Sequence, residues 1–308
     1  MSQTDYQTLI DAPTWAFIAA TAQSYPADTA SMTIADQRKI YDAMCRRFHR
    51  GYSDGVTAQD LQVAGVPCRD YPGAWPAVVY LHGGGFVVGG LHSHDDICAE
   101  IRAVTGLRVM SVDYRLSPEH KHPAAYDDAL AVARALLADG PILLAGDSAG
   151  GTLAAACAHA LRGAPDLRGQ VLIYPGLGGD WTRGSYLTHA HAPMLTRDEA
   201  KFYAGIRFAG PEPRDDPTAA PLHDTDFTTL PPTVAISAEC DPLADDALHY
   251  CDRLTRAGVR AHLILEPGLV HGYLRARATV PRAAASFARI TTAITALAAG
   301  DWPYGDVR

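Results

Sequence analysis

The residues best suited to covalent chemistry form the hexapeptide GDSAGG at residues 146–151. It stands between a short apolar run, which is typical of a strand, and a run of small residues, which is typical of a helix. Gly146 and Gly150 lack a Cβ, so strand and helix can approach closely around a strained serine. The pattern predicts a sharp turn that presents Ser148 Oγ as a nucleophile and the Ala149 amide at a helix N-terminus, which favours negative charge. A glycine-rich turn without chemistry is the alternative.

A second motif with chemical potential is HGGGF, which begins at His82 directly after an apolar run. Three successive glycines let backbone N–H groups converge on one point, and such a point can hold an oxyanion. We expect the amides of Gly83, Gly84 and Ala149 to form this oxyanion hole, with Gly85 supporting the bend. A phosphate-binding loop is disfavoured because no Lys-Ser or Lys-Thr pair follows. We expect His82 to be a structural hydrogen-bonding residue rather than a base.

The elements that must position these motifs alternate along the chain from about residue 60 onward. Most apolar runs are short and rich in Val, Ile and Leu, as in parallel strands covered on both faces. The strand candidates are Leu61–Cys68, Ala77–Leu81, Arg108–Tyr114, Ile142–Gly146, Gln170–Tyr174, Thr233–Ala238 and His262–Glu266. The helix candidates are Asp95–Thr105, Pro123–Ala138, Gly150–Leu161, Leu243–Ala257 and Pro281–Ala299. This alternation predicts the α/β class, with a doubly wound, mostly parallel sheet in a single domain over residues 1–308.

Two regions interrupt this alternation: a helix-prone segment over residues 1 to about 50 and a long insertion over about 176–232. An insertion of this length is often functional. We expect the two regions to form a helical cap over the carboxyl edge of the sheet, the alternative being peripheral helices without substrate contact. Eight large side chains are candidate pocket walls, with packing inside the cap as the alternative: Trp15, Phe17, Trp181, Tyr186, Met194, Phe202, Tyr203 and Phe208.

The composition excludes several classes of protein. Lys plus Arg number 26 and Asp plus Glu number 34, so the formal net charge is −8. This charge argues against nucleic acid and anionic membrane surfaces as main partners. No apolar stretch reaches the roughly 20 residues of a membrane span, and the region before the apolar residues 12–22 has Asp but no Lys or Arg, unlike a signal peptide. Six scattered cysteines indicate reduced thiols, and we expect a cytoplasmic protein.

Four sequence blocks together carry a family resemblance. They are HGGGF at 82–86, YRLSPEHKHPAA at 114–125, GDSAGG at 146–151, and DPL at 241–243 followed by HGY at 271–273. With these blocks the chain resembles the bacterial hormone-sensitive-lipase-like carboxylesterases of the α/β-hydrolase superfamily, from about residue 77 to residue 275. The resemblance implies that fold, a capped active site and ester hydrolysis.

The catalytic acid of this fold follows the serine in the chain and stands on a loop after a strand. The strand candidate 233–238 is followed by Asp241, which matches the catalytic acid of the family. Glu239, Asp245 and Asp246 are neighbouring carboxylates. The last two fall in the first turn of the next predicted helix, where carboxylates stabilise the N-terminus without chemistry. We therefore predict Asp241 as the acid.

The histidine follows the acid in chain order. Three histidines follow Asp241, namely His249, His262 and His271. The first should lie within a helix and the second within the last strand. His271 follows that strand, at the edge of the sheet where Ser148 is also expected, and we predict it as the general base.

Three further residues have predicted supporting roles. Asp147 precedes the serine and is expected to support its turn. In the block at 114–125, whose role in the family is mainly structural, Arg115 and Glu119 are expected to form an ion pair that braces loops near the oxyanion hole.

The leading functional hypothesis is hydrolysis of small esters with short acyl chains through an acyl-enzyme on Ser148. An amidase or a deacetylase would use the same triad, and a non-catalytic small-molecule receptor could share the fold. An interfacial lipase is disfavoured by the enclosed cap. No cofactor is implied, and no metal is expected at the His-x-His runs at 92/94, 120/122 and 189/191, which have no third ligand at a suitable spacing. The resemblance also implies a possible homodimer through the last strand and helix.

Overall fold

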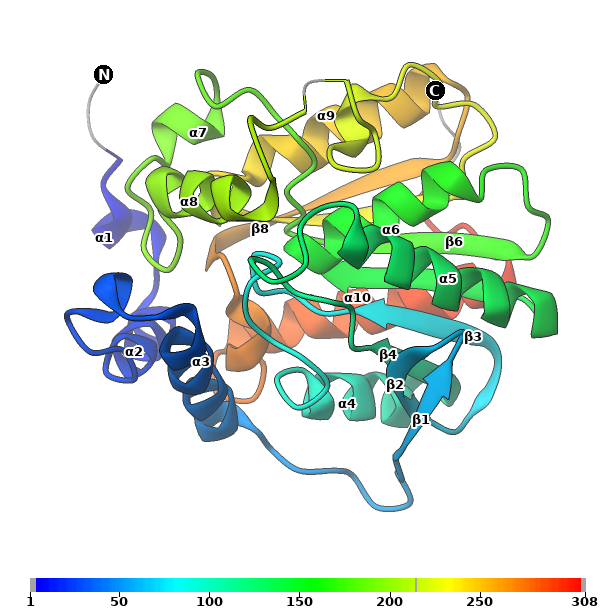
Figure 1. The fold of residues 1–308 in the computed structure, drawn as a ribbon, viewed down its shortest axis with the longest axis horizontal. Helices are drawn as coiled ribbons and strands as arrows, with labels where there is room; N and C mark the ends of the chain where they lie inside the picture. The colour runs from blue at the N-terminus through cyan, green and yellow to red at the C-terminus, as the bar shows by residue number, and fades with distance from the viewer. Residues whose placement is uncertain (1–3, 214, 306–308) are drawn as a thin grey trace.

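The computed structural model describes residues 4–213 and 215–305, and an eight-stranded sheet runs through it with helices on both faces (Figure 1). The strands are β1 (Gln59–Val63), β2 (Val66–Tyr71), β3 (Ala74–Leu81), β4 (Leu107–Val112), β5 (Ile142–Asp147), β6 (Leu167–Ile173), β7 (Thr233–Cys240) and β8 (Ala261–Val270). Their order is β1-β2-β4-β3-β5-β6-β7-β8. Strand β2 is antiparallel to β1 and β4, and the pairs from β4 to β8 are parallel. The predicted α/β class with a mostly parallel sheet is confirmed.

The helices are divided between the two faces and one end of the sheet. They are α1 (Tyr6–Leu9), α2 (Ala12–Ala22), α3 (Ile34–Phe48), α4 (Asp95–Thr105), α5 (Ala124–Asp139), α6 (Ala149–Ala160), α7 (Ser185–Thr188), α8 (Arg197–Arg207), α9 (Ala244–Arg256) and α10 (Pro281–Ala299), with 3-10 turns η1 (Thr29–Ser31), η2 (Pro221–His223) and η3 (Tyr273–Ala276). Helices α5, α6 and α9 pack on one face, and α4 and α10 pack on the other. Figure 1 shows α1–α3 and α7–α8 gathered at the left, beyond one end of the sheet.

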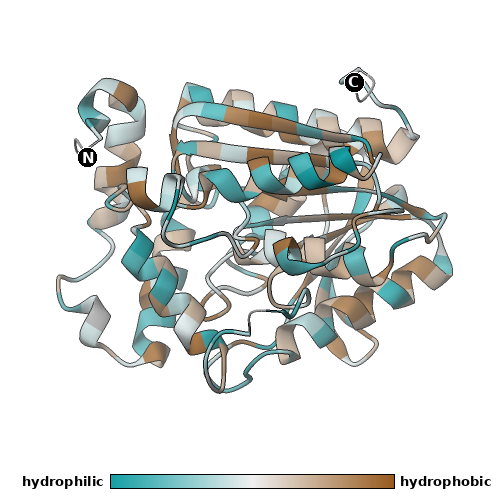
Figure 2. Ribbon diagram, turned by 90° about the horizontal axis from the view of Figure 1, so that it is seen from above, coloured by the Kyte–Doolittle hydropathy of each residue, from teal (hydrophilic) through white to brown (hydrophobic). Residues whose placement is uncertain are grey.

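Burial on both faces explains why the central strands are so apolar. All six residues of β5 are buried, and so are the last five of β3. Figure 2 shows brown stretches in strands inside the molecule, and helices that carry both brown and teal segments. A helix with one apolar stripe and one polar face covers a sheet in this way.

One predicted strand is wrong. The run Leu61–Cys68 is not a single strand, because the chain reverses at Ala64 and Gly65 and forms the hairpin of β1 and β2. Both turn residues have positive φ, 49° and 81°. A two-residue turn of this kind matches the twist of paired strands and favours glycine. Gly65 is the residue from which this turn could have been predicted in the sequence.

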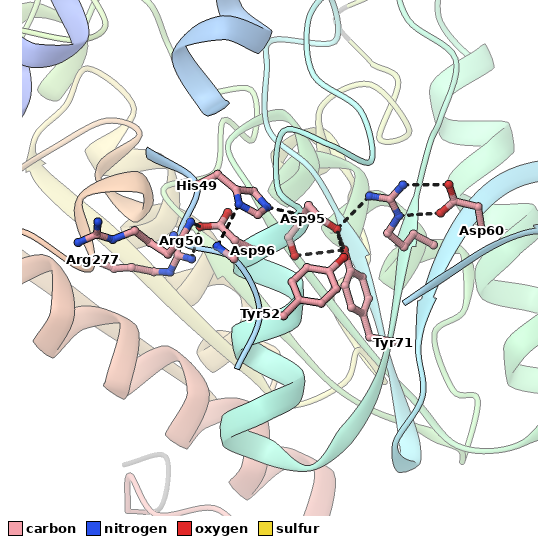
Figure 3. A network of polar contacts seen from close by, with 10 residues as sticks. His49, Arg50, Tyr52, Asp60, Tyr71, Asp95, Asp96 and Arg277 are labelled. Atoms are coloured by element: carbon pink, nitrogen blue, oxygen red, sulfur yellow. Dashed lines mark hydrogen bonds and ion pairs between the residues drawn. The ribbon is translucent and has the colours of Figure 1, made fainter. Parts of the chain in front are cut away.

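A polar network ties the N-terminal segment to the sheet where the chain leaves α3 (Figure 3). His49 Nε2 lies 3.1 Å from Asp95 Oδ2, and the Tyr52 hydroxyl donates to Asp95 Oδ1 over 2.6 Å. The next carboxylate, Asp96, accepts from Arg277 Nη2 over 2.7 Å. Both carboxylates stand in the first turn of α4, where a helix N-terminus favours negative charge. The exit of the N-terminal segment is thereby fixed to α4.

Candidate active site

Ser148 lies at the sharp turn between β5 and α6, with φ of 53° and ψ of −118°. A non-glycine residue in this region of backbone space is strained, and such strain clusters at functional sites. The turn depends on its glycines. A Cβ on Gly146 would lie 2.5 Å from the carbonyl carbon of Gly150, and a Cβ on Gly150 would lie 1.9 Å from the Leu81 oxygen. The predicted close approach of strand and helix around the serine is therefore present.

The structure brings together the three residues predicted as a triad, from the ends of β5, β7 and β8. His271 Nε2 lies 2.9 Å from Ser148 Oγ, and His271 Nδ1 lies 2.7 Å from Asp241 Oδ2. Asp241 is fully buried, and its Oδ1 accepts from the Leu243 amide over 2.9 Å. Because the carboxylate accepts at Nδ1, this nitrogen bears the proton and Nε2 is free to accept one from the serine. The arrangement can activate a hydroxyl for attack on a carbonyl carbon.

The oxyanion hole requires one correction to the predicted residues. Gly84, Gly85 and Ala149 line the cavity beside Ser148, but Gly83 does not. The Gly83 amide instead donates to Asp147 Oδ1 over 3.0 Å, so it cannot also serve an oxyanion. Gly85, which lines the cavity, is the candidate that remains in place of Gly83.

Asp147 supports both the serine turn and the glycine loop. It is 2 % exposed and accepts from the Tyr80 hydroxyl over 2.9 Å and from the Gly83 amide over 3.0 Å, with His94 Nε2 at 3.3 Å. Burial alone would raise the pKa of Asp147. His94, the charge of Arg275 and the hydrogen bond from Tyr80 together outweigh burial and hold the pKa of Asp147 well below its usual range. The carboxylate is therefore a buried anion that joins two motifs distant in sequence.

His82 is a structural residue in its contacts. Its Nδ1 donates to the Gly83 oxygen over 2.8 Å, and its ring stacks on Tyr114 with a centroid distance of 4.3 Å. Burial lowers the pKa of His82 to about 3, so the ring is neutral near pH 7. It lies outside the Ser148–His271–Asp241 arrangement.

The predicted ion pair between Arg115 and Glu119 is wrong. Arg115 pairs with Asp128 of α5, where Nε and Nη2 each donate over 2.8 Å. Glu119 pairs with Arg38 of α3, whose Nη2 lies 2.7 Å from Oε2. Both true partners, Asp128 of α5 and Arg38 of α3, lie outside the block at 114–125 from which the pair was predicted.

Arg38 was not among the residues predicted from the sequence. Its Nε donates to the Val87 oxygen over 2.7 Å, and its Nη2 donates to the Ser117 oxygen over 2.8 Å. Val87 belongs to the loop that continues from the glycines. A cation on α3 thus binds two loop carbonyls beside the candidate site, and no motif in the sequence signals this contact.

A cavity of about 400 Å³ opens above Ser148 and is lined by both non-sheet segments. Five of the eight candidate wall residues line it: Trp181, Tyr186, Met194, Tyr203 and Phe208. Three do not: Trp15 and Phe17 pack into the hydrophobic core, and Phe202 is 49 % exposed. Several wall residues were not anticipated, and they include Ile18, Tyr25, Tyr41, Met44, Arg207 and Arg275.

The His-x-His runs have other partners in the structure. His92 pairs with Asp42 over 2.7 Å, and His122 pairs with Asp216 over 3.1 Å. In the part of the chain that the structure describes, His, Cys, Asp and Glu side chains form no group of three or more that could hold a metal ion. Within the same residues, no helix has the length and apolar character needed to cross a membrane.

Comparison with known proteins gives concordant results. A family described as "alpha/beta hydrolase fold" matches residues 78–275. Carboxylesterase NlhH of Mycobacterium tuberculosis (strain CDC 1551 / Oshkosh) is 40 % identical over 253 residues, which cover 78 % of this chain and 78 % of that protein. Ethyl acetate hydrolase of Pseudomonas putida is 35 % identical over 221 residues, 68 % of this chain and 70 % of that protein.

Solved structures of similar fold are also esterases. A crystal structure of an esterase from the bacterial hormone-sensitive lipase family superposes with a TM-score of 0.84 at 31 % identity, covering 92 % of this chain and 98 % of that one. The predicted resemblance is confirmed over sequence and fold. The chain belongs to the hormone-sensitive-lipase-like carboxylesterases of the α/β-hydrolase superfamily.

Proposed function

We propose that Ser148, His271 and Asp241 are the catalytic triad through which this carboxylesterase hydrolyses small esters. The observation that carries the proposal is the hydrogen-bonded path from Ser148 Oγ through the His271 ring to Asp241, with contacts of 2.9 and 2.7 Å. The strained backbone of Ser148 and the buried acid support it. The similar carboxylesterase and ethyl acetate hydrolase support ester hydrolysis as the reaction.

The reaction proceeds in two halves. His271 Nε2 takes the Ser148 proton as Oγ attacks the ester carbonyl, while Asp241 holds the imidazole in its tautomer and stabilises the imidazolium. The amides of Gly84, Gly85 and Ala149 stabilise the oxyanion. The imidazolium returns the proton to the leaving alcohol, and an acyl-enzyme remains. Water, deprotonated by the same histidine, then releases the acid and restores the serine.

We also propose that residues 1–50 and about 176–232 act together as a cap that selects the substrate. Both regions contribute walls to the cavity: Ile18, Tyr25 and Tyr41 from the first, and Trp181 and Tyr203 from the second. The cap encloses a volume of about 400 Å³, near the lower end of ligand pockets. A short acyl chain matches this volume better than a palmitoyl chain, and one relative is named for ethyl acetate. Rates on acetyl, butyryl, octanoyl and palmitoyl esters test this preference, which a maximum at palmitoyl would contradict.

The triad is tested by Ser148→Ala, with the exposed Ser53→Ala as a matched control. We expect the first variant to lose on the order of 10⁶ in kcat on p-nitrophenyl butyrate, because the triad acts as a unit. The control should retain the wild-type rate. Labelling by an organophosphate should reach the wild type and the control but not Ser148→Ala. Hydrolysis that survives in Ser148→Ala rejects the assignment, and a p-nitroanilide analogue measures whether amides are cleaved as well.

The proposal extends to location and assembly. We propose a cytoplasmic protein, supported by six cysteines that are all buried free thiols. We propose a homodimer through β8, which stands at the end of the sheet with Leu265 51 % exposed. Light scattering behind size-exclusion chromatography measures the mass in solution, and a monomer at micromolar concentration would reject the dimer.

A further inference from the structure

Arg275 is a cation in the wall of the active-site cavity that the sequence analysis and the proposed mechanism leave unused. It belongs to η3, which begins two residues after His271, and its side chain lines the same cavity as His271 and Ser148. A Cβ placed on Gly272 would lie 3.7 Å from Arg275 Nη1. The guanidinium is therefore next to the backbone of the residue that follows the proposed base.

Among the described residues, this arginine forms no direct ion pair with a carboxylate, although the charge of Asp147 acts on it. Its Nη2 donates to the Tyr41 hydroxyl, and its guanidinium lies 5.0 Å from the centroid of the Tyr41 ring. Among the described residues, Nε is buried without any acceptor, and Nη1 makes no hydrogen bond to an oxygen or nitrogen. Arg277 offers a direct contrast two positions later, because it pairs with Asp96 over 2.7 Å and with Glu100 over 2.6 Å.

The two side chains in contact with Arg275, Tyr41 and Cys45, carry no charge. Burial raises the pKa of Tyr41 well above its usual value and also raises the pKa of the Cys45 thiol, so both are neutral near pH 7. Asp147 is an anion whose charge acts on Arg275, but the two side chains make no hydrogen bond to each other, and Asp147 Oδ1 accepts from Tyr80 and Gly83 instead.

Two glutamates also line the cavity, and neither pairs with Arg275. Glu199 accepts from the amide and the hydroxyl of Thr196, both over 2.7 Å, and so completes a capping box. Glu212 is exposed. Arg275 is half-buried and its Nε has no acceptor, so its strongest partner would be an anion brought into the cavity.

We propose that Arg275 binds a carboxylate carried by the substrate, and that the preferred substrates are esters with a free carboxylate, such as the half-esters of short dicarboxylic acids. This inference rests on the proposed function, since the same triad performs the reaction. A monoalkyl half-ester and water yield the dicarboxylate and the alcohol. Arg275 supplies neither a proton nor a nucleophile; it holds the far end of the acyl chain while the ester carbonyl lies at Ser148.

The test compares matched pairs of substrates. Monoethyl succinate, glutarate and adipate are each compared with the neutral ethyl ester in which a methyl ketone replaces the carboxylate, so that length and shape are kept. Ethanol release is measured to obtain kcat/KM for each. For the best chain length we expect the wild type to favour the half-ester by roughly tenfold to a hundredfold, as a charge-assisted hydrogen bond provides. A wild type that favours every neutral ester, or shows equal values within a pair, overturns the proposal.

Variants assign the preference to Arg275. Arg275→Met should abolish the preference mainly through a higher KM for the half-ester, and Arg275→Lys should restore part of it. Arg168→Met is the matched control. Arg168 is exposed near the N-terminal end of β6, at the edge of the sheet opposite the triad, and its replacement changes the net charge by the same amount as Arg275→Met. If Arg275→Met keeps the wild-type ratio, or Arg168→Met loses it, Arg275 is not the binding group. If Arg275→Met does not fold, competitive inhibition of the wild type by glutarate decides, and absence of inhibition at millimolar glutarate overturns the proposal.

Two further arms separate the possible outcomes. An acetate ester with the carboxylate on its leaving alcohol tests the opposite orientation: a preference for it that Arg275→Met abolishes supports a carboxylate site on the alcohol side. Hydrolysis of p-nitrophenyl butyrate reports the proposed function alone. A protein that hydrolyses this neutral ester through Ser148 but ignores carboxylates rejects this inference and keeps the esterase, whereas a protein inactive on all esters rejects the proposed function.

Discussion

Arg38 Nε donates a hydrogen bond to the Val87 carbonyl oxygen over 2.7 Å, which joins α3 to the loop that continues from the three glycines. The same guanidinium binds the Ser117 oxygen and the Glu119 carboxylate. The N-terminal segment therefore helps to hold the loop that carries the proposed oxyanion amides, in addition to lining the cavity.

Replacement of Arg38 by methionine should loosen this loop. Two carbonyl oxygens lose a charged donor, and we expect the free energy of unfolding to fall by about 2 kcal/mol. We also expect a lower kcat on p-nitrophenyl butyrate with a smaller change in KM, because the oxyanion forms only after binding. Lys39→Met is the control, since Lys39 is exposed and pairs with Asp36 on its own helix. An Arg38→Met enzyme with unchanged kcat would show that the loop holds its geometry without this contact.

Replacement of Asp241 by asparagine should preserve the fold and impair catalysis. An amide can accept or donate at His271 Nδ1, so the imidazole loses its fixed tautomer, and a loss of about 10⁴ in kcat is expected. Asp245→Asn is the matched control; Asp245 accepts from the Ser185 amide over 2.8 Å and lies outside the triad. Steady-state kinetics on both variants measure the difference. Equal losses in the two variants would contradict the choice of Asp241.

Asp147→Asn should destabilise the protein and slow it. One oxygen becomes an NH₂ group among donors such as Tyr80 and the Gly83 amide, and a loss of about 3 kcal/mol is expected for a buried charge network. Tyr80→Phe removes a single donor and should cost about 1 kcal/mol. Urea unfolding gives both values, and p-nitrophenyl butyrate gives kcat. If Asp147→Asn lowers the free energy of unfolding no more than Tyr80→Phe does, the negative charge of Asp147 does not contribute to stability.

Asp246 should make stability depend on pH. It is buried and accepts from the Leu177 amide and the Tyr186 hydroxyl, and burial raises its pKa from 3.8 to about 6. Since the folded-state pKa lies above the unfolded value, the protonated carboxyl favours folding at low pH, and this contribution is lost as the pH rises through about 6. Relative to Asp246→Asn, the wild type should lose about 2 kcal/mol between pH 4 and pH 8. Urea unfolding of both proteins at each pH measures this difference, and a constant difference would contradict the raised pKa.

The sequence was sufficient for the α/β class, for the strands of the sheet other than the β1–β2 hairpin, and for the three residues of the proposed triad. Chain order narrows the acid and the base to a few candidates, and position after a strand separates Asp241 and His271 from Asp245 and His249. Glycines predict the turn at Ser148 because only they allow the close approach that the structure shows. These inferences depend on local geometry and on topology, which the sequence pattern carries.

Other features depend on contacts between distant segments. Glu119 pairs with Arg38, which is 81 positions earlier in the chain, and no local pattern predicts that choice. Phe202 and Tyr203 are neighbours on α8, yet the first is exposed and the second lines the cavity. Adjacent residues on a helix point about 100° apart, so the packing of the helix decides which one meets the substrate. The hydrogen bond from the Gly83 amide to Asp147, 64 positions later, is likewise a contact that no local pattern predicts.

The bond from the Gly83 amide to Asp147 has a consequence for protein engineering. Asp147 is covalently attached to Ser148, so the nucleophile and the glycine loop share one anchoring point although Gly83 and Asp147 are 64 positions apart in the chain. A serine turn transplanted from a hydrolase without this aspartate would lack the carboxylate that accepts the hydrogen bond from the Gly83 amide. The glycine loop at 82–86 and the serine turn at 146–151 therefore depend on each other. A chimera should exchange both motifs together or neither.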